Sequence, residues 1–322
     1  MIISRTPYRI SFAGGGSDLR KYYQEHGGAV LSTTIDKYVY LSMHPYFVES
    51  KYFLKYSSIE LVDSIKEIHH PLIREVFKHY DIKGVDFSSS ADIPSGTGLA
   101  SSSAFTVGLI SLCNSFLGKY ISKEEMAHLA CEVEIDRLKE PIGKQDQYAC
   151  AYGGLNFIEF KTDETVSVES IKLSDKQKEG LEDRLLMFYL GKSRAARLIL
   201  DDQVKKMNET KAQSNLHAMV KLAYDLKKDL CSSNIDTLGE ILHAGWMYKK
   251  ELSNKISDQL IDELYCKALK AGVTGGKLLG AGGGGFLLFY VKPEKQDEVR
   301  AAMSDLYELK FKFDHSGSTI IF

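Results

Sequence analysis

The sequence predicts an α+β protein built in two parts, and three observations support this class. Helical and strand-like patterns are mixed along the 322 residues without a steady strand–helix alternation, which argues against a doubly wound parallel sheet. Hydrophobic residues make up 44% of the chain, enough for a sizeable core. A highly charged stretch at 161–184 separates the two halves, so we expect one unit at 1–182 and another at 183–322.

The first half is expected to contain a β-rich layer followed by helices. Alternating or continuous apolar residues predict strands, whereas helical periodicity and the Ser122–Glu125 capping box predict helices. Residues 143–152 suit a helix or a turn. The strands are expected at 9–14, 29–35, 38–44, 85–90 and 153–160, and the helices at 18–26, 64–80, 101–117 and 122–138.

The second half is expected to be mainly helical, with short strands. A strand at 185–190 leads into a long helical region at 194–230. Pro293 marks the start of another helix, because proline suits the first helical turn. The other helices are expected at 236–253 and 258–271, and the other strands at 286–291, 308–313 and 318–322.

Composition excludes several classes of protein. The net charge is −2, from 41 basic and 43 acidic residues, so no long-range field favours nucleic acid or a membrane surface. The N-terminus lacks the apolar core of a signal peptide, and no apolar window is long enough to span a bilayer, so we expect a cytoplasmic protein. Five widely spaced cysteines without a CxxC pair predict neither a disulfide framework nor a zinc site.

The segment 94–104, PSGTGLASSSA, suits phosphate binding. Gly96 and Gly98 allow the backbone to turn its N–H groups inward, and the following helix directs its positive end at an anion in the loop. Serines also cap helices without any ligand. Three consecutive serines, Ser101 to Ser103, exceed what one cap requires, which favours the phosphate interpretation.

A second glycine-rich run, at 280–285, matches the pattern GxGxxG. It follows a helical pattern and precedes a strand, which is the reverse of the order in a dinucleotide-binding fold. No GxxxxGK[ST] string occurs either. The spacing alone leaves two alternatives open, a tight turn without ligand or a turn that serves the site.

Two carboxylates follow the serine loop. Asp146 stands among polar and small residues, and Glu134 lies twelve residues earlier near the end of a helix that could face it. Phosphoryl transfer needs a metal to offset phosphate charge and a group that orients or deprotonates the attacking hydroxyl. Charged residues at helix ends usually face solvent, so this pair alone does not decide the function.

The order of these motifs resembles a known family. RTPYRISFAGGGSDL at 5–19, PSGTGLASSSA at 94–104, GKQDQ at 143–147 and KLLGAGGGGF at 277–286 are similar to the three motifs and the catalytic aspartate of the GHMP small-molecule kinases, the galactokinase and mevalonate kinase superfamily. The resemblance spans nearly the whole chain and is strongest to the sugar-kinase branch. It implies an N-terminal domain like ribosomal protein S5 and a C-terminal ferredoxin-like domain.

The resemblance also implies roles for individual residues. Asp146 would act as the general base, Arg9 would orient it or stabilise developing charge, and Ser102 with Glu134 would hold Mg²⁺. The family's nucleotide loop, which would cradle the ATP phosphates, corresponds to Pro94, Gly96, Gly98, Leu99, Ala100, Ser101, Ser102 and Ser103. Sugar-binding positions correspond to Gly15, Gly16, Ser17 and Asp18 of the first motif and to Gly283 of the third.

The acceptor is expected to be a sugar that already carries a phosphate. Galactokinases have an acidic residue and a histidine where this chain has Gly15 and Gly16, so the pocket is more open and galactose is disfavoured. A phosphate would need cations, for which Arg194 is the first candidate, with Arg197 and Lys144.

The resemblance implies phosphorylation of the anomeric hydroxyl of a heptose 7-phosphate. The alternatives are an anomeric kinase for fucose or another hexose, and a nucleotide-binding homologue without turnover. Retention of Arg9, Glu134 and Asp146 together argues against the second. The sequence does not determine the oligomeric state.

Overall fold

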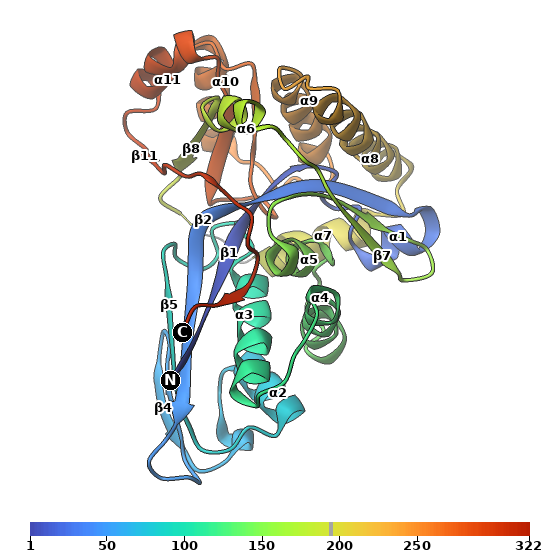
Figure 1. The fold of residues 1–322 in the computed structure, drawn as a ribbon. Coiled ribbons are helices and arrows are strands. Elements are labelled where there is room, and N and C mark those ends of the chain that lie inside the picture. Colours follow the sequence, from blue (N-terminus) through green and yellow to red (C-terminus); the bar gives the residue numbers. More distant parts are fainter. Residues whose placement is uncertain (193–195) are drawn as a thin grey trace.

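The computed structural model describes residues 1–192 and 196–322, arranged in two lobes that each contain a sheet with helices (Figure 1). This arrangement confirms the predicted α+β class. In the described residues the larger sheet has nine strands and the smaller has four. The larger comprises β1 (Ile2–Ala13), β2 (Gly28–Pro45), β3 (Tyr52–Lys55), β4 (Ile59–Val62), β5 (Val85–Ala91), β6 (Leu155–Phe160), β7 (Val166–Ser170), β12 (Phe313–Asp314) and β13 (Thr319–Ile320). The smaller comprises β8 (Leu185–Tyr189), β9 (Gly275–Leu278), β10 (Phe286–Tyr290) and β11 (Tyr307–Glu308).

The long strand β2 organises the larger sheet. The strands expected at 29–35 and 38–44 form one continuous element of 18 residues. It pairs with β1 along most of its length, with β6 over its first part and with β5 over its last part. Because each part has its own neighbour, the polar pair at Asp36 and Lys37 does not interrupt the strand.

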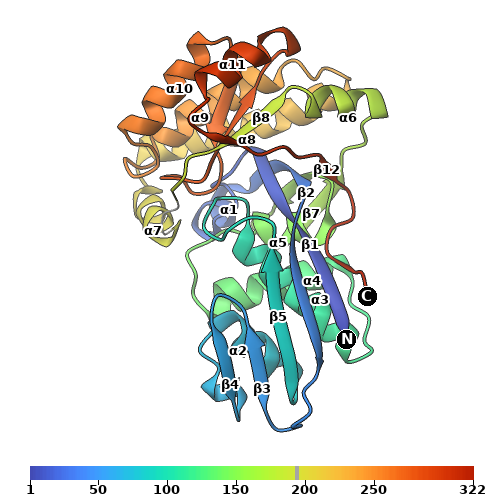
Figure 2. The same ribbon diagram turned by 90° about the vertical axis from the view of Figure 1, so that its left-hand side faces the viewer.

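Helices of the first lobe cover one face of this sheet, and α2, α3 and α4 lie behind the strands in Figure 2. The helix expected at 64–80 is a short 3-10 turn at Ile65–Glu67 followed by a helix that begins at Pro71. The helix expected at 122–138 continues as a π-helix over Glu132–Arg137. The helices are α1 (Arg20–His26), α2 (Pro71–Tyr80), α3 (Ser101–Phe116), α4 (Lys123–Cys131) and α5 (Gln145–Tyr152).

The second lobe packs its helices against the smaller sheet, and α8 and α9 lie side by side in Figure 1. The region expected to be helical at 194–230 contains two helices that meet near residue 208. Strand β9 was not predicted, because Gly275-Gly276-Lys277-Leu278 carries no strand pattern. The helices are α6 (Asp175–Glu182), α7 (Ala196–Lys206), α8 (Thr210–Cys231), α9 (Leu238–Lys250), α10 (Gln259–Lys270) and α11 (Gln296–Ala302). None of the described helices is both long and apolar enough to cross a bilayer.

The chain returns to the first lobe at its end. Strands β12 and β13 pair with β2 and β1, and the Ile3 N–H donates to the Phe322 carbonyl at 2.9 Å. The two termini therefore lie close together, as Figures 1 and 2 show. Residues 313–320 lie in the first sheet although they follow the second lobe in sequence, so the predicted division after residue 182 leaves out this return.

The charged stretch at 161–184 is more ordered than its composition suggests. It contains β7, paired with β6, and α6, whose capping box is formed by Ser174 and Gln177. The change from the first sheet to the second takes place between β7 and β8.

Candidate active site

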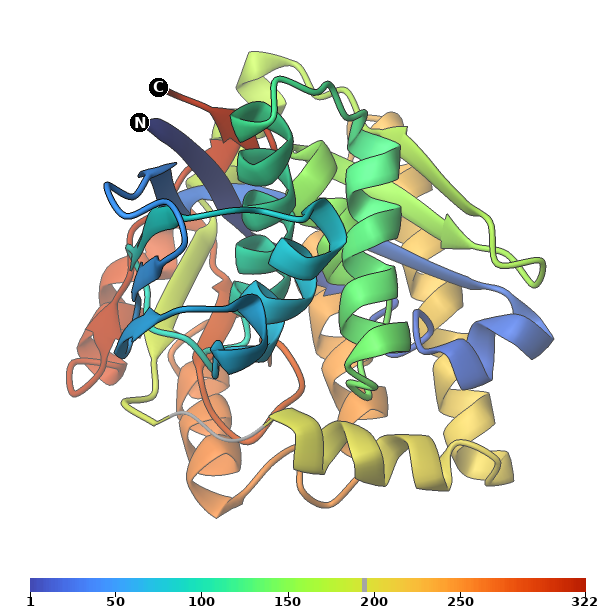
Figure 3. The ribbon, with the colours of Figure 1, turned by 90° about the horizontal axis from the view of Figure 1, so that it is seen from below.

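A cavity of about 730 Å³ draws its walls from both lobes. Its lining includes β1, the segment 95–103, the start of α5, the inner face of α7, the end of α9, β9 and the turn at 280–284. In the view from below (Figure 3), α7 is the yellow helix that runs across the lower part of the picture, below the end of the green helix α4. An ion pair of 3.3 Å between Arg197 and Glu140 links α7 to the segment after the π-helix.

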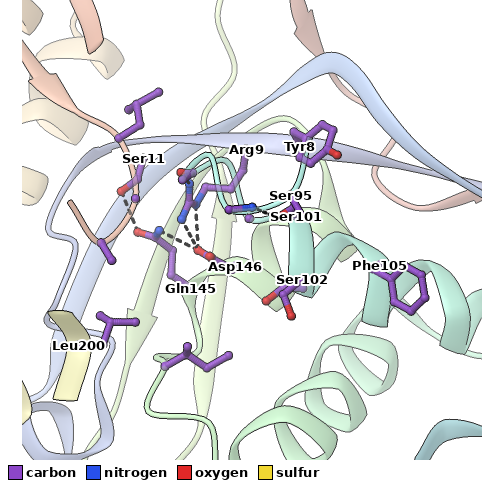
Figure 4. A pocket seen from close by; sticks show the side chains of 18 of the residues that line it. Tyr8, Arg9, Ser11, Ser95, Ser101, Ser102, Phe105, Gln145, Asp146 and Leu200 are labelled. Atoms are coloured by element: carbon purple, nitrogen blue, oxygen red, sulfur yellow. Dashed lines mark hydrogen bonds and ion pairs between the residues drawn. The ribbon is translucent and has the colours of Figure 1, made fainter. Parts of the chain in front are cut away.

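Arg9 on β1 joins two parts of this cavity. Its Nε and Nη2 atoms lie 2.8 and 2.7 Å from Oδ1 of Asp146, and its Nη1 donates to the Gly98 carbonyl at 2.9 Å. Figure 4 shows the Arg9 side chain reaching toward Asp146 from the strand. The guanidinium is almost wholly buried, so it holds the carboxylate and the glycine loop in a fixed relation.

Asp146, in the first turn of α5, has one oxygen occupied and one open. Besides Arg9, the amide of Gln145 donates to Oδ1 at 3.1 Å, and Ser11 fixes that amide by donating to its oxygen at 2.9 Å (Figure 4). Hydrogen bonds among residues 1–192 and 196–322 do not engage Oδ2, and the side chain is 28% exposed. An oriented carboxylate with a free oxygen suits acceptance of a proton from a bound hydroxyl.

The serine loop leaves the start of α3 open. Gly96 and Gly98 have φ of 76° and 84°, and Ala100, the residue before the helix, has φ of 69° and makes no side-chain cap. The hydroxyls of Ser102 and Ser103 donate to Glu134 instead of capping the helix. This removes the capping alternative raised by the sequence and leaves the first amides of α3 available to an anion.

The glycine run at 280–285 packs against the serine loop at 94–104. A Cβ at Gly280 would lie 2.3 Å from the Gly98 Cα, and a Cβ at Gly285 would lie 2.2 Å from the Thr97 oxygen. Both glycines have positive φ, so the two loops pack backbone to backbone. Gly282 and Gly284 line the cavity, whereas the Gly283 N–H donates to Ile256 at 2.8 Å and lies outside the lining.

Glu134 lies in the π-helix beneath the serine loop and is fully buried. It accepts hydrogen bonds from Ser102 and Ser103 at 2.7 and 2.9 Å and from the Gln147 amide at 2.7 Å. Burial raises the pKa of Glu134, and the nearby charge of Asp146 adds to this, against the effect of the three bonds. The described donors are all neutral, so a cation beside this carboxylate would offset its charge.

The donor set of Ser102 and Glu134 fits Mg²⁺. Both offer the hard oxygen atoms that Mg²⁺ prefers, and Mg²⁺ in phosphoryl-transfer sites takes one or two protein ligands together with water and substrate phosphates. Within the described residues no group of three or more His, Cys, Asp or Glu side chains is placed to hold a metal. The site would therefore depend on phosphate oxygens for its remaining ligands.

The first motif builds the wall next to Asp146. Asp18 is buried and accepts from the N–H groups of Gly16 and Gln145 at 2.9 and 3.2 Å. A Cβ at Gly143 would lie 2.0 Å from its Oδ2, so only glycine fits there. Burial and the charge of Asp146 raise the pKa of Asp18.

The other predicted residues divide into those that line the cavity and those behind it. The lining includes Gly15, Gly16, Asp18, Gly96, Gly98, Ala100, Ser101, Ser102 and Ser103. Pro94, Leu99, Ser17 and Glu134 are not part of it. Ser17 is buried and donates to the carbonyls of Gly14 and Ala29 at 2.8 and 3.1 Å, which shapes the turn.

The cations predicted for a sugar phosphate have different positions. Arg194 lies outside the described residues. Arg197 lines the cavity at its exposed rim and pairs with Glu140. Lys144 pairs with Glu164, lies over the Tyr23 ring with its Nζ 4.7 Å from the centroid, and does not line the cavity.

Sequence reasoning missed two buried lysines of the cavity. Lys249 on α9 is 8% exposed and Lys277 on β9 is 5% exposed. Lys249 donates to the Gly280 carbonyl, and Lys277 donates to the Phe12 carbonyl at 3.1 Å. Helical spacing could have indicated Lys249, because it follows Leu242 and Trp246 on the buried face of α9.

It also missed the aromatic end of the cavity. The His70 and Phe105 rings are stacked with centroids 5.2 Å apart, and the Tyr56 ring lies perpendicular to His70 at 4.9 Å. Burial lowers the pKa of His70, which favours the neutral ring. The adjacent histidines at 69 and 70 suggested no role, but Pro71 marks the start of a helix and so places His70 at its cap.

The buried charge of Lys249 predicts a pH effect on stability. Burial and the Arg9 charge disfavour its protonated form, Asp18 and Asp146 favour it, and the pKa is lowered from 10.5 to about 8. The unfolded chain therefore binds one more proton between these values, so the free energy of unfolding should rise from pH 8 to pH 10.5. Lys249→Met should make this rise smaller in urea denaturation series, whereas Lys250→Met, at a partly exposed position, should not. If the free energy of unfolding rises equally with pH in both variants, the effect does not come from Lys249.

Two family models match the chain. Residues 65–154 match the GHMP kinases N terminal domain, and residues 226–309 match the GHMP kinases C terminal domain.

Among relatives, the chain is 30% identical over 333 residues to the D-glycero-alpha-D-manno-heptose 7-phosphate kinase of Campylobacter jejuni, covering 98% of this chain and 97% of the other. Among solved structures, it is similar to a D-glycero-D-manno-heptose 1-phosphate kinase from Bacteriodes thetaiotaomicron, with 25% identity, a TM-score of 0.83 and coverage of 100% and 99%. It is also similar to a putative sugar kinase from Campylobacter jejuni, with 28% identity, a TM-score of 0.79 and coverage of 99% and 97%.

Proposed function

The chain belongs to the GHMP kinases and is a sugar kinase that uses ATP, and we propose that its acceptor is D-glycero-D-manno-heptose 7-phosphate, phosphorylated on the anomeric hydroxyl. The Campylobacter relative is named as a kinase of a heptose 7-phosphate, and the Bacteriodes structure is named for a heptose phosphate as well. The observation that carries the reaction is the Arg9 bridge, which joins Asp146 to the glycine loop.

The nucleotide is proposed to extend from the aromatic end of the cavity to the serine loop. Tyr56, His70 and Phe105 offer flat, uncharged surfaces for the base. The open amides at the start of α3 and the glycine backbone would bind the phosphates. This orientation directs the γ-phosphoryl group toward Arg9 and Asp146.

In the proposed step, the anomeric oxygen attacks the γ-phosphorus and its proton passes to the open Oδ2 of Asp146. The bond between the γ-phosphorus and the β,γ-bridging oxygen breaks, and the electron pair leaves with ADP. Arg9 holds Asp146 oriented and offsets charge on the transferring group. Asp18 and the open turn at Gly15 and Gly16 would contact the sugar.

Ser102 and Glu134 are proposed to hold Mg²⁺. When bound, the ion would neutralise phosphate charge and fix the phosphate orientation. The support is the buried carboxylate of Glu134, to which only neutral described groups donate.

Glu134→Gln tests this assignment. The amide removes the buried charge and offers a poor ligand, so the Mg²⁺ concentration for half-maximal activity should rise roughly 10- to 100-fold. The melting temperature should stay equal or rise, because burial already raises the pKa of Glu134 and so opposes its ionised form. Mg²⁺ titrations of the initial rate give the comparison, with Glu132→Gln, a partly exposed neighbour in the same π-helix, as the control. An unchanged Mg²⁺ requirement would remove Glu134 from the site.

A coupled ATP-consumption assay tests the acceptor. It compares D-glycero-D-manno-heptose 7-phosphate with the heptose 1-phosphate, mannose, fucose and galactose. We expect turnover of the 7-phosphate at a kcat/KM at least about tenfold above each other sugar, which one charge-assisted phosphate contact suffices to produce. Turnover of the 1-phosphate would overturn the anomeric assignment, because that position is already occupied. Preference for a free hexose would retain the kinase and reject the heptose.

A further inference from the structure

The two buried lysines of the cavity have no anionic partner in the described part of the chain. Among residues 1–192 and 196–322, no carboxylate lies within ion-pair distance of Lys249 or Lys277, and each ammonium makes one bond, to a backbone carbonyl. An ammonium has three donors, so two remain on each lysine. Both side chains line the cavity, where a ligand can reach them.

The carboxylates of the same cavity are already engaged. Oδ1 of Asp146 accepts from Arg9 and Gln145, and Asp18 accepts from two backbone N–H groups. A buried charge without a partner is strongly unfavourable. Burial accordingly lowers the pKa of Lys249 to about 8 and that of Lys277 well below its usual value. An anionic ligand in the cavity would supply the negative charge that the described side chains do not bring within ion-pair distance, and it would favour the protonated form of both lysines.

Lys249 lies close to the centre of the reaction. Its acceptor is Gly280, which packs directly against Gly98, and Gly98 is also held by Arg9. Lys277, on β9, contacts β1 at the Phe12 carbonyl, three residues after Arg9. The two ammonium groups thus extend from the contact of the two glycine loops along the strand that carries Arg9.

We propose that Lys249 and Lys277 form a second phosphate-binding subsite, distinct from the start of α3. The subsite rests on the proposed function, and its ligand is a phosphate oxyanion. That oxyanion belongs either to the phosphate that the acceptor carries or to the phosphoryl group in transfer. In both cases the lysines contribute charge that Arg9, occupied by Asp146 and Gly98, does not supply alone.

The direct test is binding of inorganic phosphate to the enzyme saturated with ADP and Mg²⁺ at pH 7, measured by calorimetry. ADP fills the nucleotide part of the cavity and leaves the subsite open. We expect Lys249→Met to raise the Kd for phosphate at least about tenfold, as the loss of one charge-assisted bond implies. Lys277→Met should change it in the same direction.

Thermal unfolding separates this role from a structural one. Because the substitution removes a buried unpaired charge, Lys249→Met should melt at the same temperature as the parent or higher. The matched control is Lys250→Met, the next residue on α9, which is partly exposed and pairs with Asp262. Its phosphate affinity should equal that of the parent.

Steady-state kinetics then identifies the source of the oxyanion. If KM for the sugar phosphate rises at least tenfold while kcat and KM for ATP are retained, the lysines bind the acceptor's phosphate. If kcat falls while both KM values are retained, they act on the phosphoryl group in transfer.

Phosphate affinity and kinetics equal to those of the parent in both lysine variants would overturn the subsite. If the parent fails to turn over any heptose phosphate, the proposed acceptor fails. The phosphate titration still decides the subsite in that case, because it does not depend on turnover.

Discussion

Asp146→Asn is expected to lower kcat at least about 100-fold while nucleotide affinity is retained, since general-base contributions are about 10²- to 10⁴-fold. The asparagine oxygen can keep the place of Oδ1 and accept from Arg9 and Gln145. Its amide group then occupies the position of the open Oδ2 and donates where a proton must be accepted. The bond from Arg9 to the Gly98 carbonyl does not involve Asp146, so the glycine loop keeps its shape.

The measurement pairs turnover with equilibrium binding of an ATP analogue. Asp175→Asn, exposed on α6 and away from the cavity, is the control and should match the parent in both. A kcat within tenfold of the parent would exclude Asp146 as the group that accepts the proton. Alanine is a poorer test, because it would leave the buried Arg9 without its carboxylate and so lower stability as well.

Local signals predicted much of this fold. The Ser122–Glu125 capping box predicted the start of α4, and the serine run predicted the start of α3. Both depend on residues adjacent in sequence. The boundaries that failed depend on distant partners: β2 continues through Asp36 because β5 and β6 pair with its two ends, and β9 forms because β10 lies beside it.

The candidate site likewise has features that depend on neighbouring residues in sequence and features that depend on distant ones. The glycines and serines of the proposed phosphate loop, at 94–104, form a local sequence pattern, and Asp146 and Arg9 stand within motifs of their own. The contact of Gly280 with Gly98 joins two loops about 180 residues apart, and no local pattern reveals it. Lys249 and Lys277 are two of 41 basic residues, and only the closing of both lobes around one cavity removes them from solvent.

The π-helix is a further feature that helical periodicity could not reveal. Residues 132–137 continue the pattern of α4, and the sequence alone suggests one regular helix. Within this π-helix, Glu134 is buried under Ser102 and Ser103, which donate to it. A regular α-helix has a narrower turn, so its side chains from this point on would point in different directions. The position of the proposed Mg²⁺ ligand thus depends on this irregularity, in agreement with the frequent occurrence of π-bulges at functional sites.

Gly98→Ala is expected to reduce kcat/KM for ATP at least about 100-fold, because small displacements in a catalytic site have effects of this size. A Cβ at this position would lie 2.5 Å from the Leu279 oxygen, which belongs to the backbone of the supporting loop and cannot rotate away. The residue also has φ of 84°, where alanine is strained. The two loops must separate, and the Gly98 carbonyl then moves from Arg9, which holds Asp146. One methyl group thus disturbs both the proposed phosphate loop and the contact of Arg9 with Asp146, the proposed catalytic pair.

Gly118→Ala provides a matched control for this prediction. Gly118 also has a positive φ, of 65°, but a Cβ there would meet no atom within 4 Å. Both variants should therefore lose stability from backbone strain, on the order of 1 kcal/mol. Only Gly98→Ala should lose catalysis, and the loss should include a higher KM for ATP. If the two variants have equal kinetic constants at a temperature where both are folded, contact between the glycine loops is not needed for nucleotide binding. If Gly98→Ala alone is impaired, the third motif acts through the backbone shape it imposes on the phosphate loop, even though Gly283 itself lies outside the cavity.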